Sequence, residues 1–163
     1  REMYNIGDRV VYPMHGAGVI DSIEEKEILG KLQKYYVMKM PLGDMKVMIP
    51  MSNTEGIGIR DIIDSEEADR VLVSFKEYEV ECEQSWNKRY RENMIKIKSG
   101  NIHEVARVVK MLMCRDREKG LSTGERKMLT NAKQILISEL VLAKNMVQEE
   151  IEKLIESIIA EAK

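Results

Sequence analysis

Cysteine, proline and large aromatic side chains are scarce in this chain of 163 residues. It contains two cysteines, three prolines, one phenylalanine and one tryptophan. Cys82 and Cys114 are far apart and form no Cys-x-x-Cys pair, so neither a disulfide framework nor a zinc ribbon is expected. Isolated thiols of this kind are typical of a reducing compartment. No apolar run is long enough to span a bilayer, and the N-terminus has no secretory signal pattern. We therefore expect a cytoplasmic protein without a membrane partner.

Catalytic motifs are also missing. The two histidines, His15 and His103, have no Cys, His or paired carboxylate at metal-ligand spacing. The glycines beside His15 are not followed by a helical pattern that could cradle a phosphate. No P-loop, Gly-x-Ser-x-Gly or dinucleotide-binding motif occurs. We therefore expect no enzymatic activity, no cofactor, no metal and no small-molecule substrate.

What the chain does have is a strong segregation of charge. Residues 1–84 carry 10 basic and 17 acidic side chains, residues 85–145 carry 14 and 6, and residues 146–163 carry 2 and 5. The corresponding net charges are −7, +8 and −3. A basic segment of this size favours a polyanionic partner, although lysine and arginine also cover the solvated faces of ordinary helices.

Residues 8–59 have the pattern of short strands separated by turns. The stretch "EKEILGKLQKYYVMKM" predicts two strands that turn at residues 29–31. In the next strand, "MKVMIP", a period of two places Lys46 and Met48 on the face opposite its other apolar residues. A fifth short strand is expected in "GIGI", residues 56–59. Five short strands in so few residues suit a small, strongly bent barrel or sheet.

After residue 63 the apolar period changes to that of helices. Successive apolar stripes separated by short glycine turns predict a compact bundle that ends in an acidic helix. The expected fold is therefore α+β, with a β-domain over residues 1–63 and a helical domain over residues 64–163. The side chains expected to cap the first four helices are Ser65, Ser85, Asn101 and Ser122.

Trp86, the only tryptophan, lies at the start of a predicted helix in the stretch "SWNKRYRENMIK". At helical spacing it shares an apolar stripe with Tyr90 and Ile97, which favours a core aromatic. Arg89 and Arg91 flank this stripe on opposite sides, and the first turn of a helix leaves part of an indole uncovered. An indole between cations is what a minor-groove wedge requires. The pattern leaves the core and the wedge interpretations open.

A second basic feature follows the capping-box sequence "STGE". Arg126 and Lys127 lie in the first turns of the helix that this sequence begins. Cations are unfavourable at a helix N-terminus unless an anion binds there, and the main-chain N–H groups at that end favour an anion. We therefore expect both side chains to contact phosphate.

Four stretches of the chain occur together and in the same order in a known protein family. They are "IGDRVVYPMHGAGVI", "YYVMKMPLGDMKVMIP", "SWNKRYRENMIKIKSGNIHEVARVV" and "DREKGLSTGERKML". From about residue 6 to residue 144 the chain resembles the CarD/CdnL family of bacterial transcription regulators. The first half alone also resembles a module of the transcription-repair coupling factor. The helical half and the lack of any helicase motif separate the chain from that factor.

The resemblance implies a Tudor-like barrel that binds the β subunit of bacterial RNA polymerase through an exposed strand. It also implies a helical domain that contacts promoter DNA at the upstream edge of the melted bubble. In this family the wedge tryptophan corresponds to Trp86, and basic DNA contacts correspond to Arg91 and Arg126. Polymerase-facing positions correspond to Lys26 and Met48, where relatives can carry arginine.

Position adds three residues to these two sets. Lys46 joins the polymerase-binding set because it shares a predicted strand face with Met48, and Arg89 and Lys127 join the DNA-binding set. The expected protein is a nucleoid-associated regulator that contacts the minor groove with little sequence specificity, because that groove carries a degenerate code. The alternative is a protein–protein adaptor in which Trp86 is structural and DNA is not contacted specifically.

Overall fold

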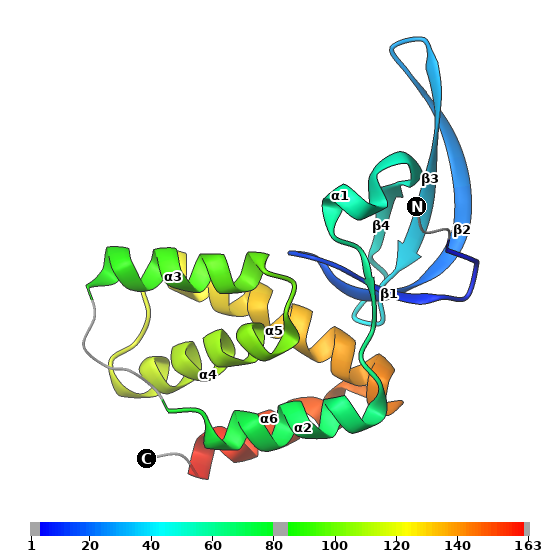
Figure 1. Cartoon of the computed structure of the whole chain (residues 1–163). Coiled ribbons are helices and arrows are strands. Elements are labelled where there is room, and N and C mark those ends of the chain that lie inside the picture. The colour runs from blue at the N-terminus through cyan, green and yellow to red at the C-terminus, as the bar shows by residue number, and fades with distance from the viewer. Residues whose placement is uncertain (1–3, 80–84, 162–163) are drawn as a thin grey trace.

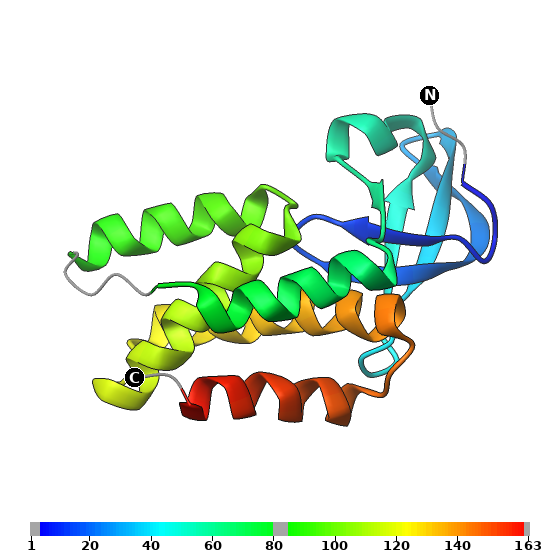
Figure 2. The same ribbon diagram turned by 60° about the horizontal axis from the view of Figure 1, so that its bottom comes forward.

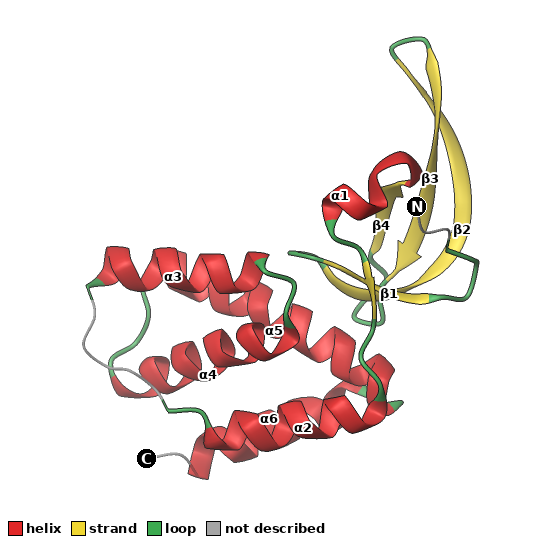
Figure 3. Cartoon of the chain, in the orientation of Figure 1, coloured by secondary structure: helices red, strands yellow, loops and turns green. Residues whose placement is uncertain are grey.

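The structure, a computed structural model, describes residues 4–79 and 85–161. Five strands form one antiparallel sheet in the order β4-β3-β2-β1-β5, and the helices follow it (Figures 1 and 3). The predicted α+β class is confirmed. The strands are β1 (Arg9–Tyr12), β2 (Gly16–Ile28), β3 (Lys31–Lys39), β4 (Lys46–Pro50) and β5 (Arg60–Asp61).

The β2–β3 hairpin is the longest part of the sheet and projects away from the helices (Figure 1). Its turn contains Leu29 and Gly30, whose φ angles are 54° and 80°. Two successive residues with positive φ form the type of turn whose twist matches that of the flanking strands. The turn predicted at residues 29–31 is therefore confirmed. A register shift between Ile20 and Ser22 bends β2 below the hairpin.

The predicted fifth strand at residues 56–59 is wrong. A short helix, α1 (Thr54–Ile57), occupies the first two residues of that stretch and ends at Gly58, whose φ is 93°. The main-chain N–H of Gly58 donates to the carbonyls of Thr54 and Glu55, which closes the helical turn. The alternation of glycine and isoleucine imitated a strand, whereas the left-handed glycine is a helix end. The fifth strand is β5, which comes directly afterwards.

The remaining helices are α2 (Ser65–Glu77), α3 (Trp86–Lys98), α4 (Ile102–Glu118), α5 (Thr123–Lys144) and α6 (Gln148–Glu161). The predicted caps of α3, α4 and α5 are confirmed, because Ser85, Asn101 and Ser122 each accept a main-chain N–H from the first turn. The predicted cap of α2 is wrong by one position. Asp64 accepts the N–H of Glu67 at 2.8 Å, and Ser65 is the first helical residue.

Two apolar clusters form the interior. The larger one joins all five long helices, and the smaller one lies inside the sheet and includes Met38 and Met40. Flexible methionine side chains fill space that aromatic residues fill in other cores. The sheet cluster contains only six buried residues, so the sheet depends on contact with the helices. Trp86 belongs to neither cluster.

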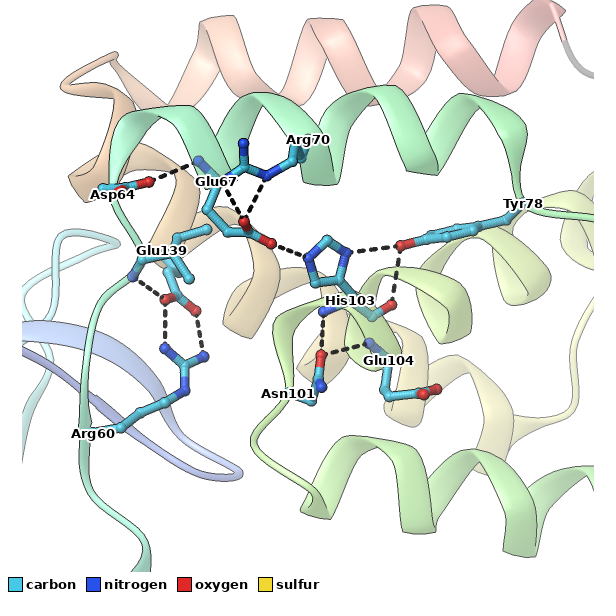
Figure 4. A network of polar contacts seen from close by, with 10 residues as sticks. Arg60, Asp64, Glu67, Arg70, Tyr78, Asn101, His103, Glu104 and Glu139 are labelled. Carbon is cyan, nitrogen blue, oxygen red and sulfur yellow. Dashed lines mark hydrogen bonds and ion pairs between the residues drawn. The ribbon is translucent and has the colours of Figure 1, made fainter.

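Helix α5 joins the two parts of the molecule (Figures 1 and 2). The main-chain N–H of Ala17 in β2 donates to the buried hydroxyl of Ser138 at 2.8 Å. Arg60 donates two hydrogen bonds of 2.8 Å to the carboxylate of Glu139, which is fully buried (Figure 4). The N–H of Ile63 donates to the same carboxylate at 2.9 Å. A buried carboxylate needs such partners, so these bonds hold the sheet against α5.

A second polar network ties α2 to α4 (Figure 4). His103 donates from Nε2 to the carboxylate of Glu67, and Arg70 also donates to this carboxylate at 2.7 Å. These two hydrogen bonds lower the pKa of Glu67, and the one from His103 has the larger effect. The other ring nitrogen of His103 lies 3.4 Å from the hydroxyl of Tyr78. His103 is thus a polar link between helices.

Within residues 4–79 and 85–161, no helix combines the length and the apolar character that crossing a bilayer requires. The same part of the chain contains no group of three or more His, Cys, Asp or Glu side chains that could hold a metal ion.

Candidate nucleic-acid and protein interfaces

Trp86 is the first residue of α3, directly after the cap Ser85. The N-terminal end of α3 lies at the end of the helical part farthest from the sheet (Figures 1 and 2). The other end of α3 lies at the junction with the sheet, where Gly100 accepts a hydrogen bond of 2.9 Å from Arg60. Thirteen helical residues span about 20 Å. The tryptophan is therefore held well away from the sheet.

The indole of Trp86 is partly covered and partly open. Its ring stacks on Tyr90 with a centroid distance of 4.8 Å and an interplanar angle of 15°. Its N–H donates to the hydroxyl of Ser122 at 3.0 Å. Trp86 as a whole residue nevertheless keeps an exposed fraction of 42%. One face of the ring thus lies against Tyr90 and one edge against Ser122, while the residue stays open to solvent.

Arg89, which the sequence predicted to contact DNA, is buried in the structure, with an exposed fraction of only 4%. Its Nε donates to the carboxylate of Glu125 at 2.6 Å and its Nη2 at 3.2 Å, and Glu125 is itself 1% exposed. The helical pattern correctly placed Arg89 beside the apolar stripe. It could not reveal that α5 would cover that side and supply a buried carboxylate. Arg89 fastens α3 to the start of α5.

The other three basic side chains predicted to contact DNA are exposed. Arg91 follows Trp86 on α3, and Arg126 and Lys127 lie at the start of α5. Because Ser122 accepts the Trp86 N–H, the start of α5 lies directly beside the indole. Arg126 also lies 3.5 Å from Asp116 and donates to the carbonyl of Leu121 at 3.3 Å. The start of α5, beside the indole, thus carries two exposed basic side chains.

A shallow depression extends this basic surface along α5. Its lining residues have only basic, hydroxyl or amide side chains, namely Thr123, Arg126, Lys127, Thr130, Asn131 and Gln134. They recur at the three- and four-residue spacing of one helix face, a signal that sequence reasoning missed. The two carboxylates of α5, Glu125 and Glu139, are both buried and paired with arginines from other elements. The positive charge on the exposed side of α5 is therefore not offset by acids of the same helix.

The predicted polymerase-binding residues gather on the sheet. β4 is an edge strand, and within the described residues no further strand pairs with it. Lys46 and Met48 pair with Lys39 and Val37 of β3, and Lys26 pairs with Gln33. These β3 residues are separated by even numbers, so the register places all three predicted residues on one face of the sheet. The opposite face carries the buried cluster that includes Tyr36, Met38 and Ile49.

Of the two cysteines, the structure describes Cys114. Cys114 is a partly buried free thiol on α4, and burial raises its pKa, which disfavours the reactive thiolate. Cys82 lies outside the described residues. His15 is exposed in the turn after β1 and contacts the ring of Tyr12 at a centroid distance of 4.3 Å.

Two family descriptions match the chain. Residues 4–63 match the CarD-like/TRCF RID domain, and residues 70–156 match the CarD C-terminal domain. The chain is 44% identical over 149 residues to YdeB of Bacillus subtilis (strain 168), a candidate transcription factor, with 91% of this chain and 97% of YdeB covered. A second similarity is to the solution NMR structure of the N-terminal domain of Myxococcus xanthus CarD, with 33% sequence identity and a TM-score of 0.31. This match covers 35% of the present chain and 76% of the CarD domain.

The two family descriptions and the similarity to YdeB define a transcription regulator. More particularly, the chain belongs to the CarD family, as its sequence motifs predicted.

Proposed function

We propose that this protein binds the β subunit of RNA polymerase through its sheet and stabilises the promoter open complex by inserting Trp86 into the minor groove. The wedge is supported above all by one observation. Trp86, with an exposed fraction of 42%, is the first residue of α3, and its indole contacts Ser122 at the start of α5, where Arg126 and Lys127 are exposed. This combination suits a distorted duplex, because cations bind phosphates while an apolar ring enters beside a base step.

The sheet is suited to a protein partner. Its edge strand β4 offers main-chain donors and acceptors for an added strand, and the face that carries Lys26, Lys46 and Met48 supplies side-chain contacts. The net charge of −7 over residues 1–84 disfavours DNA as the partner of this half. Binding to polymerase raises the local concentration of the DNA-binding half at the promoter.

Stabilisation of the open complex follows from a difference in affinity. A wedge must offset an unstacking cost of a few kcal/mol, and this cost is lower where the duplex is already opening. The protein therefore binds the open complex more tightly than the closed one, which shifts the equilibrium between them. A preference of about 1.4 kcal/mol shifts it tenfold. No step requires covalent chemistry, so the proposed role is non-enzymatic.

The DNA half of the proposal is tested by the affinity of the full chain for two duplexes of the same sequence, one with a pre-melted segment. We expect the pre-melted duplex to bind about tenfold more tightly, and Trp86→Ala to remove this preference. Contacts from Arg91, Arg126 and Lys127 predict a slope of about −2.7 for log affinity against log salt. Equal affinities for the two duplexes would contradict the wedge.

The polymerase half is tested by charge reversal on the two faces of the sheet. Lys46→Glu changes the proposed contact face, whereas Lys34→Glu changes an exposed lysine whose register places it on the other face. We expect the first variant to weaken binding to the polymerase and the second to leave it unchanged. If both variants bind like the natural protein, another surface makes this contact. If polymerase binding persists while the DNA preference is absent, the protein is the adaptor alternative.

A further inference from the structure

Although Trp86 is exposed, two contacts with neighbouring side chains hold its indole in one orientation. The indole N–H donates to Ser122 at 3.0 Å, and the ring stacks on Tyr90. A Cβ atom placed on Gly124 would lie 3.6 Å from both rings, so the main chain of α5 passes close to the pair. A tryptophan with only apolar neighbours could change rotamer on the surface, whereas this one is held by a directional bond.

The hydroxyl of Ser122 has two acceptor roles. It accepts the indole N–H and, as the cap of α5, it also accepts the main-chain N–H of Glu125 at 3.2 Å. A hydroxyl oxygen has two lone pairs and can accept both bonds. The buried ion pair between Arg89 and Glu125 lies on the same turn and holds α3 at this position. The orientation of the indole and the start of α5 are therefore coupled.

We propose that Ser122 is a positioning residue that fixes the indole of Trp86 in its DNA-binding orientation before DNA arrives. The positioning of the indole follows from the contacts in the free protein, whereas its effect on DNA binding rests on the proposed function. Immobilising one flexible side chain on binding costs about 0.5–1.5 kcal/mol, and an indole that is already immobilised avoids this cost. Loss of the Ser122 hydroxyl is therefore expected to weaken binding to pre-melted DNA about two- to tenfold.

The variant must remove the acceptor without removing the helix cap. Ser122→Gly does this, because glycine at a cap position costs only a few tenths of a kcal/mol relative to serine. Ser122→Thr keeps a hydroxyl and should restore the natural behaviour. Asn101→Gly is the matched control, since it weakens the cap of a different helix, α4, and leaves the acceptor of the indole N–H in place.

Because Trp86 is the only tryptophan, its fluorescence reports on this one side chain. We would measure nanosecond anisotropy decay and acrylamide quenching of the full chain without DNA, and then its affinity for pre-melted DNA. We expect Ser122→Gly to add a fast internal motion of the indole, to increase quenching and to weaken DNA binding. Ser122→Thr and Asn101→Gly should behave like the natural protein.

Two results would overturn the inference. The indole of Ser122→Gly could remain as immobile as in the natural protein, in which case the hydrogen bond does not position it. Alternatively the indole could become mobile without any loss of DNA affinity, in which case its orientation does not matter for binding. A failure of the proposed function is distinguishable, because Trp86→Ala would then leave the DNA preference intact, whatever the fluorescence of Ser122→Gly shows.

Discussion

The buried ion pair between Arg89 and Glu125 makes the sharpest prediction about stability. Both side chains are at most 5% exposed, and two hydrogen bonds of 2.6 and 3.2 Å join them. Removal of one partner leaves the other charge buried without its partner, which costs about 3–5 kcal/mol. We expect this cost for Arg89→Met and for Glu125→Gln. Since the whole domain is stabilised by only about 5–15 kcal/mol, either variant should be visibly less stable.

The double variant separates an interaction from two independent losses. Urea unfolding of the natural protein, the two single variants and Arg89→Met/Glu125→Gln gives the coupling free energy. We expect the double variant to lose at least about 1 kcal/mol less than the sum of the singles, because neither buried charge remains. Arg91→Met is the matched control on the same helix. Its exposed side chain should contribute within about 0.5 kcal/mol. Additive losses, or a control as damaging as Arg89→Met, would refute the assignment.

Three further changes have expected outcomes. Lys110→Met removes a buried ammonium that donates to two main-chain carbonyls at the end of α2 at 2.7 and 2.8 Å. Urea unfolding should show a loss of about 1–3 kcal/mol in the free energy of unfolding. A loss smaller than the error of the fit would contradict this role. Asp116→Asn releases the exposed Arg126 from its carboxylate neighbour and should tighten DNA binding about two- to fourfold at low salt, with weaker binding as the contradicting result. Glu67→Gln tests the lowered pKa of Glu67. The ionised carboxylate contributes stability above the ordinary pKa of 4.5, and this contribution is lost as the pH falls through the lower pKa of the folded state. The difference in melting temperature between natural protein and Glu67→Gln should therefore be present at pH 6 and shrink below pH 4.5; a constant difference would show that His103 does not favour the charged form.

Local signals in the sequence predicted much of the fold. Caps at Ser85, Asn101 and Ser122 act on the turn that follows them, so the residues next to each cap are sufficient to identify it. The hairpin turn at Leu29 and Gly30 is local in the same sense. The wrong strand at residues 56–59 shows the limit of this reasoning, because a short helix that ends on glycine can imitate the alternation of a strand.

The candidate site depended on contacts that sequence does not reveal. Arg89 binds Glu125, and Trp86 donates a hydrogen bond to Ser122. In both pairs the partner lies 36 residues further along the chain. Helical periodicity gave the correct side of α3 for each residue but not the identity of the covering element. An arginine that looked like a surface cation became a buried support for this reason. Conversely, the open fraction of Trp86 followed from its place in the first turn, which the sequence did contain.

In the proposed function, Trp86 inserts into the distorted minor groove and stabilises the separated strands beside a bound polymerase. The direct measurement is the lifetime of promoter open complexes formed by the cognate polymerase with the natural full-length protein, Trp86→Ala or Trp86→Phe. Loss of one stacked ring is worth about 1–3 kcal/mol. We therefore expect Trp86→Ala to bind polymerase normally yet to shorten the lifetime at least about fivefold, with Trp86→Phe in between. An unchanged lifetime for Trp86→Ala with polymerase binding intact would contradict the account.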